Sequence, residues 1–321
     1  MSPRARVGLV VAAIAAAAAA VAVAIGAGTG GDRSTAPVVE APQPRLGRPP
    51  LAYRFGVRDD PETRALLQGA RELDAGRVAA ARRVFAHVDS LEGKVGSAFA
   101  AWPNGTVDRL VQLAGLYPRS SLVQLHLGLA LFWANLEGAQ AAWREAEDVQ
   151  PDSPYALVAE DLLHPRLVPG VPVFVPSVPL PTAVAGKPAG EQLRALREGS
   201  SRGPAWRLYH GVVLQRAGRR VSARRAFDAA VAAQPGAVEP LVAAAVARFD
   251  KDRPEQAFSR LGPLTRRFPH SATVRFHLGL LLLWTGQLEE ARRQLRLAQQ
   301  AETDSPLARE AGRWLERLPS R

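Results

Sequence analysis

The sequence predicts an all-α protein in which helix-turn-helix hairpins stack into two lobes, behind an amino-terminal transmembrane helix. Three observations predict this architecture. A pattern of small, turn-forming, large and helix-breaking residues recurs every 34 residues, which indicates an array of similar structural units. Two longer stretches match each other at a separation of 151 residues, which indicates two related lobes. An uncharged apolar segment near the amino terminus has the length of a membrane span.

Residues 7–29 are the predicted transmembrane segment, because they carry no charge and are almost entirely small or aliphatic. Arg4 and Arg6 precede the segment, so we expect residues 1–6 to be cytoplasmic and the bulk of the chain to be extracytoplasmic. The alternative is a cleaved secretory signal, since Ala22-Val23-Ala24 fits the small-residue cleavage pattern. Abundant arginine, alanine, glycine and proline are typical of a GC-rich bacterial genome. The expected location is therefore a bacterial cell membrane, spanned once, or the exterior after signal cleavage.

Residues 30–57 form the next segment, which contains five prolines and few aromatic residues. This composition is typical of a semi-extended spacer rather than a packed element. We expect the segment to hold the globular part of the chain away from the bilayer.

The repeat is clearest in the stretch that begins at Gly211 and continues through Gly218, Ala223, Phe227 and Pro235. Gly211 falls in the middle of a helix, where glycine is unfavourable unless another backbone approaches closely. Gly218 lies where the first helix ends and the chain turns. Ala223 and Phe227 share one face of the second helix, which Pro235 terminates. Each unit is therefore predicted to be a pair of antiparallel helices.

Equivalent units recur 34 and 68 residues further on, and earlier copies bring the total to six units over residues 62–303. This pattern resembles the tetratricopeptide repeat, whose helix-turn-helix units stack into a right-handed superhelix. The tryptophan and tyrosine of the family signature are mostly replaced here by aliphatic residues. The resemblance implies an α-solenoid and a non-enzymatic role in binding other proteins.

The stretches 118–133 and 269–284 match at the separation of 151 residues, and His126 is thereby paired with His277. Each stretch is followed by Asp-Ser-Pro and by one further helix, which we predict to be a cap that covers the last apolar face. We expect both histidines to be structural, because they are copies of one repeat position.

The two predicted lobes, residues 58–164 and residues 191–321, are separated by a proline-rich insertion at residues 165–190. So much proline is expected to exclude helix and central strand from the insertion. Hydrophobic residues alternate with the prolines over residues 171–181, which favours an extended segment docked on a surface. The segment is either a spacer between lobes, or it fills the concave groove of one lobe or presents itself to a partner.

The resemblance places ligand binding in the concave groove, which the first helices of the units line. This face is largely apolar and carries aromatic residues of the kind that anchor protein interfaces. The residues that the resemblance assigns to a protein-binding groove are Leu129, Phe132, Trp133, Val212, Arg216, Val246, Phe249, Phe276, Leu280, Leu283 and Trp284, and Gln215 and Glu239 lie on the same face. The expected ligand is a peptide or a protein partner.

Other classes of function find little support in the sequence. The formal charge of +11 comes from scattered arginines rather than a basic stripe, so a nucleic-acid partner is not expected. The absence of cysteine removes thiolate sites, and no two of the six histidines have the spacing of metal ligands on a helix. No phosphate loop, nucleophile elbow or dinucleotide fingerprint is present. We therefore expect no enzyme activity, no cofactor and no metal. The alternative function is an accessory protein that binds anionic envelope polymers through its arginine-rich surface.

Overall fold

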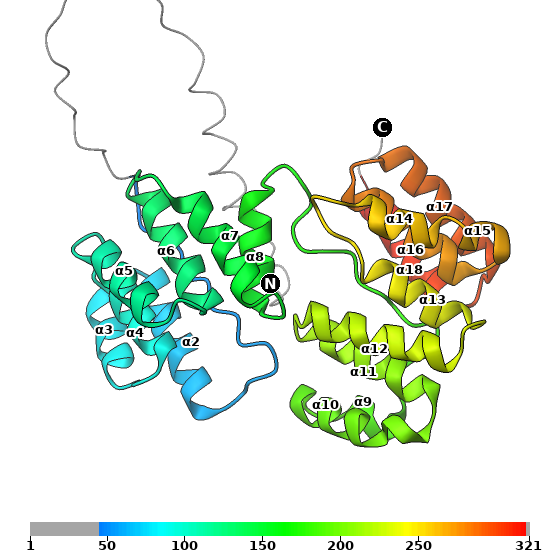
Figure 1. The fold of residues 1–321 in the computed structure, drawn as a ribbon, viewed down its shortest axis with the longest axis horizontal. Helices are drawn as coiled ribbons and strands as arrows, with labels where there is room; N and C mark the ends of the chain where they lie inside the picture. The colour runs from blue at the N-terminus through cyan, green and yellow to red at the C-terminus, as the bar shows by residue number, and fades with distance from the viewer. Residues whose placement is uncertain (1–44, 319–321) are drawn as a thin grey trace, which may run out of the picture. The chain divides into compact units, whose positions relative to one another are not determined.

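The computed structural model describes residues 45–318, and every regular element in this part of the chain is a helix (Figure 1). The predicted all-α repeat architecture is confirmed. The chain divides into unit 1, which is Met1–Pro151 with Tyr155–Arg166, and unit 2, which is Asp152–Pro154 with Leu167–Arg321. The predicted cytoplasmic residues 1–6 and the predicted transmembrane segment 7–29 lie outside the described residues. Among the helices within residues 45–318, none combines the length and the hydropathy needed to cross a membrane.

Unit 1 is a series of three hairpins followed by a single helix, and successive helices of the hairpins pack against each other. Its elements are α2 (Pro61–Asp74), α3 (Val78–Ala86), α4 (Leu91–Ala100), α5 (Thr106–Leu116), α6 (Ser121–Trp133), α7 (Ala139–Val149) and α8 (Pro154–Leu163). The first helix of each hairpin begins behind a side-chain cap, because Asp60, Ser90 and Ser120 each accept a backbone N–H from the first turn. The last helix, α8, lies where the sequence predicts a cap.

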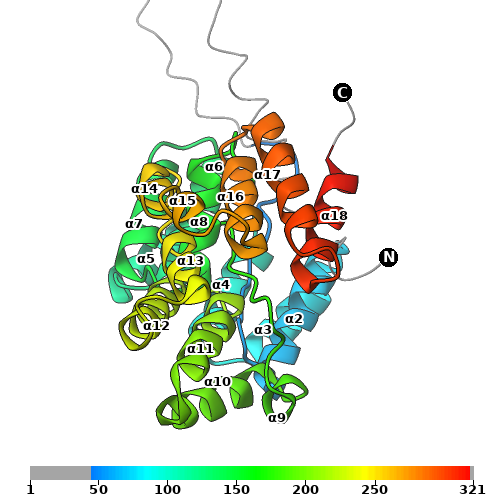
Figure 2. The ribbon, with the colours of Figure 1, turned by 90° about the vertical axis from the view of Figure 1, so that its right-hand side faces the viewer.

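Unit 2 repeats this plan with additional elements at its beginning. Its elements are α9 (Thr182–Ala185), α10 (Ala189–Glu198), the 3₁₀ helix η1 (Gly199–Arg202), α11 (Pro204–Arg216), α12 (Arg220–Ala233), α13 (Val238–Val246), α14 (Glu255–Leu261), α15 (Leu264–Arg267), α16 (Ala272–Trp284), α17 (Leu288–Ala301) and α18 (Pro306–Arg317). Figure 2 shows α16, α17 and α18 side by side, as expected for a last hairpin closed by a capping helix.

Three details of unit 2 differ from the sequence prediction. The short helix α9 lies within the insertion that was predicted to exclude helix, in a stretch that is free of proline between Pro181 and Pro188. The helix α10 was not assigned to any of the six predicted hairpins. The second helix of the fifth unit is divided into α14 and α15 at Gly262-Pro263, because a proline has no N–H to continue the helix.

The turns inside three of the hairpins share one backbone conformation. Gly76, Gly218 and Gly286 have φ angles of 75°, 76° and 76°, in the left-handed region that favours glycine. In each turn the glycine N–H and the next residue's N–H donate to the carbonyls that end the first helix. The predicted turn position of these glycines is therefore confirmed.

The glycines in the middle of the first helices are required by packing against the second helices. A Cβ atom at Gly69 would lie 2.5 Å from a ring carbon of Phe85, and at Gly211 it would meet the ring of Phe227. For Gly211 a close approach of another backbone was predicted, whereas the three nearest atoms belong to an aromatic ring of the second helix. The glycine creates the space that this fully buried ring fills.

Substitution of Gly69 by alanine is expected to destabilise unit 1 by about 1–3 kcal/mol, since the ring of Phe85 is fixed in the core and cannot move away. Gly115 provides a matched control, because it lies in α5 and a Cβ there would meet no atom within 4 Å. Gly115→Ala is expected to stabilise the protein by up to about 1 kcal/mol, through helix propensity alone. Chemical denaturation measures both effects. If both substitutions stabilised the protein, the glycine at position 69 would not be a packing requirement.

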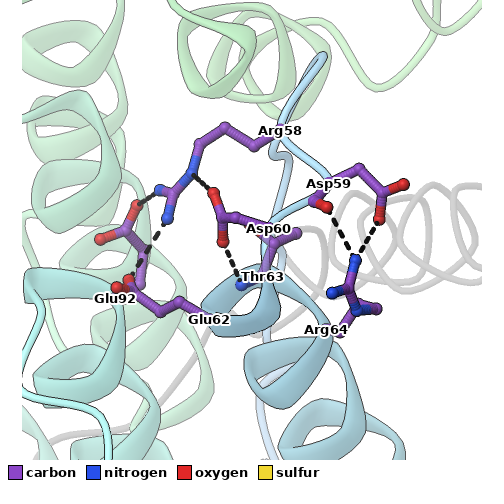
Figure 3. A network of polar contacts seen from close by, with 7 residues as sticks. All are labelled: Arg58, Asp59, Asp60, Glu62, Thr63, Arg64 and Glu92. Atoms are coloured by element: carbon purple, nitrogen blue, oxygen red, sulfur yellow. Dashed lines mark hydrogen bonds and ion pairs between the residues drawn. The ribbon is translucent and has the colours of Figure 1, made fainter. Parts of the chain in front are cut away.

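Arg58 fixes the chain where it enters the first hairpin (Figure 3). Its guanidinium lies 3.2 Å from Asp60, 3.3 Å from Glu62 and 2.9 Å from Glu92 of α4. Asp60 also accepts the N–H of Thr63 at 2.7 Å, and this hydrogen bond lowers the pKa of the Asp60 carboxyl. Because these side chains are partly exposed, the network orients the entry of the chain more than it stabilises the fold.

Candidate protein-interaction grooves

An extended segment of the insertion, residues 167–181, lies in the groove of unit 2, and we call it strap 2. The side-chain amide of Gln215, on α11, makes two hydrogen bonds to the backbone of Phe174. The Phe174 N–H donates to Oε1 and the Gln215 Nε2 donates to the Phe174 carbonyl, each at 2.9 Å. A primary amide can satisfy the N–H and the C=O of one residue in this way, as a neighbouring strand would. The groove thereby holds the main chain of strap 2.

His277 of α16 holds the next residue of strap 2. The Val175 N–H donates to Nε2 of His277 at 2.9 Å, and the opposite ring nitrogen, Nδ1, donates to the Thr273 carbonyl at 2.6 Å. Burial lowers the pKa of His277 to about 4. The imidazole is therefore neutral at pH 7, with Nε2 free to act as the acceptor.

Two further contacts extend along strap 2. Glu239, at the start of α13, accepts the N–H of Ser177 at 2.6 Å. The indole Nε1 of Trp284, at the end of α16, donates to the Gly170 carbonyl at 3.1 Å. The groove side chains that hold the strap thus come from α11, α13 and α16, the first helices of three successive hairpins. All of these bonds go to main-chain atoms of the strap.

The side chain of Phe174 supplies the apolar part of this contact. It is 1% exposed, stacks on the imidazole of His277 at 4.9 Å between ring centroids, and meets Phe227 edge-on at 5.8 Å. Leu180 and Val184 of the insertion are also buried in the core of unit 2. The insertion was predicted to be either a spacer between the lobes or a docked segment, and the structure shows a docked segment.

The groove of unit 1 is filled in a similar way by residues 45–55, which we call strap 1. The Ala52 N–H donates to Nε2 of His126 at 3.1 Å, and Nδ1 of His126 donates to the Leu122 carbonyl at 2.7 Å. Burial lowers the pKa of His126 to about 4. Tyr53 is buried, and its hydroxyl donates to the Glu92 carbonyl at 2.5 Å. The prediction that residues 30–57 are an unpacked spacer is therefore wrong for strap 1.

The two straps share a short pattern, glycine-x-proline-x-x-aliphatic, at residues 47–52 and 170–175. The two glycines have φ angles of 81° and 73°, and both of their carbonyls accept an indole N–H, from Trp102 in unit 1 and Trp284 in unit 2. Five residues later in both straps, a backbone N–H donates to a histidine Nε2. The same contacts therefore arise independently in each unit.

The predicted groove residues differ in their exposure to solvent. Those that are buried are Leu129, Val212, Val246, Phe249, Phe276, Leu280 and Leu283. Phe132, Trp133 and Trp284 are half-buried, and Arg216 is exposed. Arg45 of strap 1 binds two of them, because its N–H donates to the Trp133 carbonyl at 2.7 Å and its Nε donates to the Phe132 carbonyl at 2.8 Å.

Sequence reasoning placed Gln215, Glu239 and Trp284 on one face, and these residues contact strap 2, but it missed the contribution of strap 1. Ala52 and Tyr53 were assigned to a spacer, although both are buried. The available signal was the glycine-x-proline-x-x-aliphatic pattern, which recurs at a separation of 123 residues rather than the 151 that relates the helices. The difference arises because α9, α10 and η1 lie between strap 2 and the first hairpin of unit 2.

The ionisable side chains of the grooves determine whether a metal ion could bind there. Within residues 45–318, no three histidine, aspartate or glutamate side chains lie close enough together to hold a metal ion. The buried ionisable groups of the grooves are tyrosines and neutral histidines that pair with main-chain atoms, as Tyr53, His126 and His277 do. In the described part of each groove, the buried histidine binds the main chain of a strap.

Solved structures match this chain at low sequence identity and low TM-score. A solved structure of YrrB, described as a TPR protein with an unusual peptide-binding site, is 15% identical and covers 64% of this chain and 99% of its own, with a TM-score of 0.33. A tetratricopeptide repeat protein from Parabacteroides merdae is 11% identical to this chain. The match covers 79% of this chain and 98% of that protein, with a TM-score of 0.34. Yeast Tom70 is 13% identical to this chain. The match covers 79% of this chain and 53% of Tom70, with a TM-score of 0.28. No curated protein sequence matches the chain.

The family match is confined to the carboxy-terminal part of unit 2. Residues 248–315 match the tetratricopeptide repeat family model. This range contains α14 to α17 and most of the capping helix α18. The match identifies sequence of the tetratricopeptide repeat family within residues 248–315.

Proposed function

We propose that this protein is a non-enzymatic scaffold of the bacterial cell envelope whose grooves bind extended peptide segments of a partner protein. Residues 7–29 would anchor it in the membrane with the two units on the extracytoplasmic side, or would direct its secretion. The tetratricopeptide repeat fold suggests a protein–protein interaction scaffold. Beyond this, the proposal specifies that the ligands are extended peptide segments and that the protein is located in the cell envelope.

The single observation that carries the proposal is the seating of strap 2. The groove holds it by side-chain hydrogen bonds to main-chain atoms, together with one buried aromatic ring. In peptide receptors, main-chain hydrogen bonds supply affinity for any extended segment, and pockets for individual side chains supply specificity. A partner segment with a large apolar residue at the position of Phe174 would satisfy the same groups.

The straps act as tethered competitors for the grooves. A tethered segment has an effective concentration in the millimolar range, so a partner segment must bind more favourably than the strap that it replaces. A hollow of about 370 Å³ remains beside strap 2, lined by Val175, Pro176, Pro179, Leu180 and Arg216 among others. This opening offers a partner its first contact with the groove.

The test is binding of a fluorescent peptide with the sequence of residues 167–181 to the full chain. The peptide is expected to bind the Phe174→Ala protein at least about tenfold more tightly than the wild type, because the weakened strap competes less. Val173→Ala is the matched control, since Val173 lies on the same strap but is 40% exposed. It is expected to bind the peptide as the wild type does.

Two measurements keep the test decisive. A peptide that carries alanine at the position of Phe174 is expected to lose binding to every variant, and circular dichroism establishes that the Phe174→Ala protein is folded at the temperature of the titration. If the folded Phe174→Ala protein showed no saturable binding of the intact peptide, the grooves would be permanently filled and the peptide-binding function would be wrong.

A further inference from the structure

A second concavity of unit 2 is lined by basic side chains and is separate from the groove that holds strap 2. It is a hollow of about 520 Å³ between α10, α11 and α12, which we call the arginine hollow. Arg194 and Arg197 are three residues apart on α10, and Arg219 and Arg225 come from the start of α12 and its first turns. His210 of α11 lies between the two sides. Exposed arginines therefore converge on one concave site from two helices.

The charges of the arginine hollow are only partly neutralised. Arg219 lies 3.4 Å from Asp152, and this carboxylate also accepts the N–H and the hydroxyl of Ser222 at 2.9 Å and 2.5 Å. In the part of the chain that the structure describes, no carboxylate forms an ion pair with Arg194, Arg197 or Arg225, and no acidic residue lines the hollow. Of the four arginines that line the hollow, Arg219 is therefore paired with a carboxylate and the other three are not.

The positive charges of the hollow also affect the pKa of His210. Burial lowers the pKa of this imidazole, and the nearby charges of Arg197 and Arg219 lower it further. The floor beneath the basic groups is apolar, formed by Leu193 and Leu214 among others. Low-dielectric walls of this kind strengthen the attraction between a basic site and an anion.

We propose that the arginine hollow binds a compact, multiply charged phosphate anion through Arg194, Arg197 and Arg225. The planar guanidinium group binds phosphate oxygens in pairs, and a compact anion can meet arginines from both sides of the hollow at once. An acidic peptide carries only one charge on each side chain and would spread its carboxylates along the hollow. The site lies outside the strap-filled groove and goes beyond the proposed peptide-binding function.

Inorganic triphosphate is the probe for this site, titrated calorimetrically into the detergent-solubilised full chain. Binding to a single site is expected in the wild type, and the double substitution Arg194→Gln/Arg197→Gln is expected to weaken it at least about tenfold, because each charge-assisted hydrogen bond contributes strongly. The matched control is Arg260→Gln/Arg296→Gln. It removes the same charge from exposed arginines that line no part of the hollow and have no ion pair among the described residues. It is expected to leave the affinity unchanged.

Further outcomes separate the alternatives. Absence of saturable triphosphate binding, or equal weakening in both double variants, would overturn the proposal, as would binding of a hexaglutamate peptide where triphosphate fails to bind. The source of the phosphate is distinguished after reconstitution in phosphatidylcholine vesicles with or without phosphatidic acid. Competition between phosphatidic acid and triphosphate identifies a lipid headgroup, and equal triphosphate binding in both vesicles identifies a soluble phosphate. Both results support a phosphate site.

Discussion

Replacement of Phe174 by alanine is expected to lower the free energy of unfolding of unit 2 by about 3–5 kcal/mol, as for other fully buried aromatic rings. The ring is 1% exposed and contacts both His277 and Phe227, so its removal leaves a cavity between the strap and the helices. Chemical denaturation followed by circular dichroism measures the change.

The expected effect reaches beyond the ring, because Phe174 anchors a segment that has no helix or sheet of its own. Once the ring is lost, the hydrogen bonds of strap 2 to Gln215, His277 and Glu239 must hold an otherwise extended chain. Hydrogen exchange of the backbone amides of Phe174, Val175 and Ser177 should therefore accelerate together.

Val173→Ala is the matched control for the strap. Val173 precedes Phe174 but is 40% exposed, and a surface substitution of this kind is expected to change stability by no more than about 0.5 kcal/mol. Equal, small effects of the two substitutions would mean that strap 2 is a spacer that merely touches the groove, and the function proposed for the groove would lose its support.

The helical hairpins could be predicted because their signals are local and repeated. A small residue, a turn glycine and a large residue lie within about one hairpin of each other, as Gly211, Gly218 and Phe227 do. Three copies at one spacing fix the register of the array. The helix α10 was missed although it lies 34 residues before α12, because the proline-rich segment that precedes α10 shows no first-helix pattern.

The straps could not be predicted in the same way, because their partners are distant in sequence. Gln215 lies 41 residues from Phe174, and His277 lies 102 residues from Val175. An extended proline-containing segment has no internal hydrogen bonds that local sequence could reveal. Resemblance to a family placed Gln215 and Glu239 on the groove face, but their role as acceptors for a strap emerges only from the structure.

The two buried histidines are expected to make the protein acid-sensitive. In the folded state both have a pKa of about 4, lowered by burial from the ordinary value of 6.5. Between these values the unfolded chain binds more protons than the folded chain, so stability rises with pH across this interval. The contribution of each neutral histidine to the free energy of unfolding is fully present above about pH 6.5. It is lost as the pH falls to about 4, and the loss is up to about 3 kcal/mol for each histidine.

Protonation acts directly on the straps, because Nε2 of each histidine is the acceptor for a strap N–H. A protonated imidazole has no acceptor, so the Val175 N–H would lose its partner and face a buried positive charge. The fully buried position of His277, with its Nδ1 already bonded to the Thr273 carbonyl, leaves no alternative arrangement of the ring. Acidification should thus release strap 2 as well as destabilise unit 2.

The substitution His277→Gln separates this effect from the general titration of carboxylates. Glutamine offers an amide oxygen to the Val175 N–H but takes up no proton, so the variant is expected to lose about 3 kcal/mol less stability than the wild type between pH 7 and pH 4. The carboxylates are the same in both proteins, so the effect of their titration on stability cancels when the two are compared. His270→Gln, at an exposed position, should keep the wild-type pH dependence. If His277→Gln also kept it, the imidazole would be able to bind a proton without leaving strap 2, and its role as an obligatory neutral acceptor would be wrong.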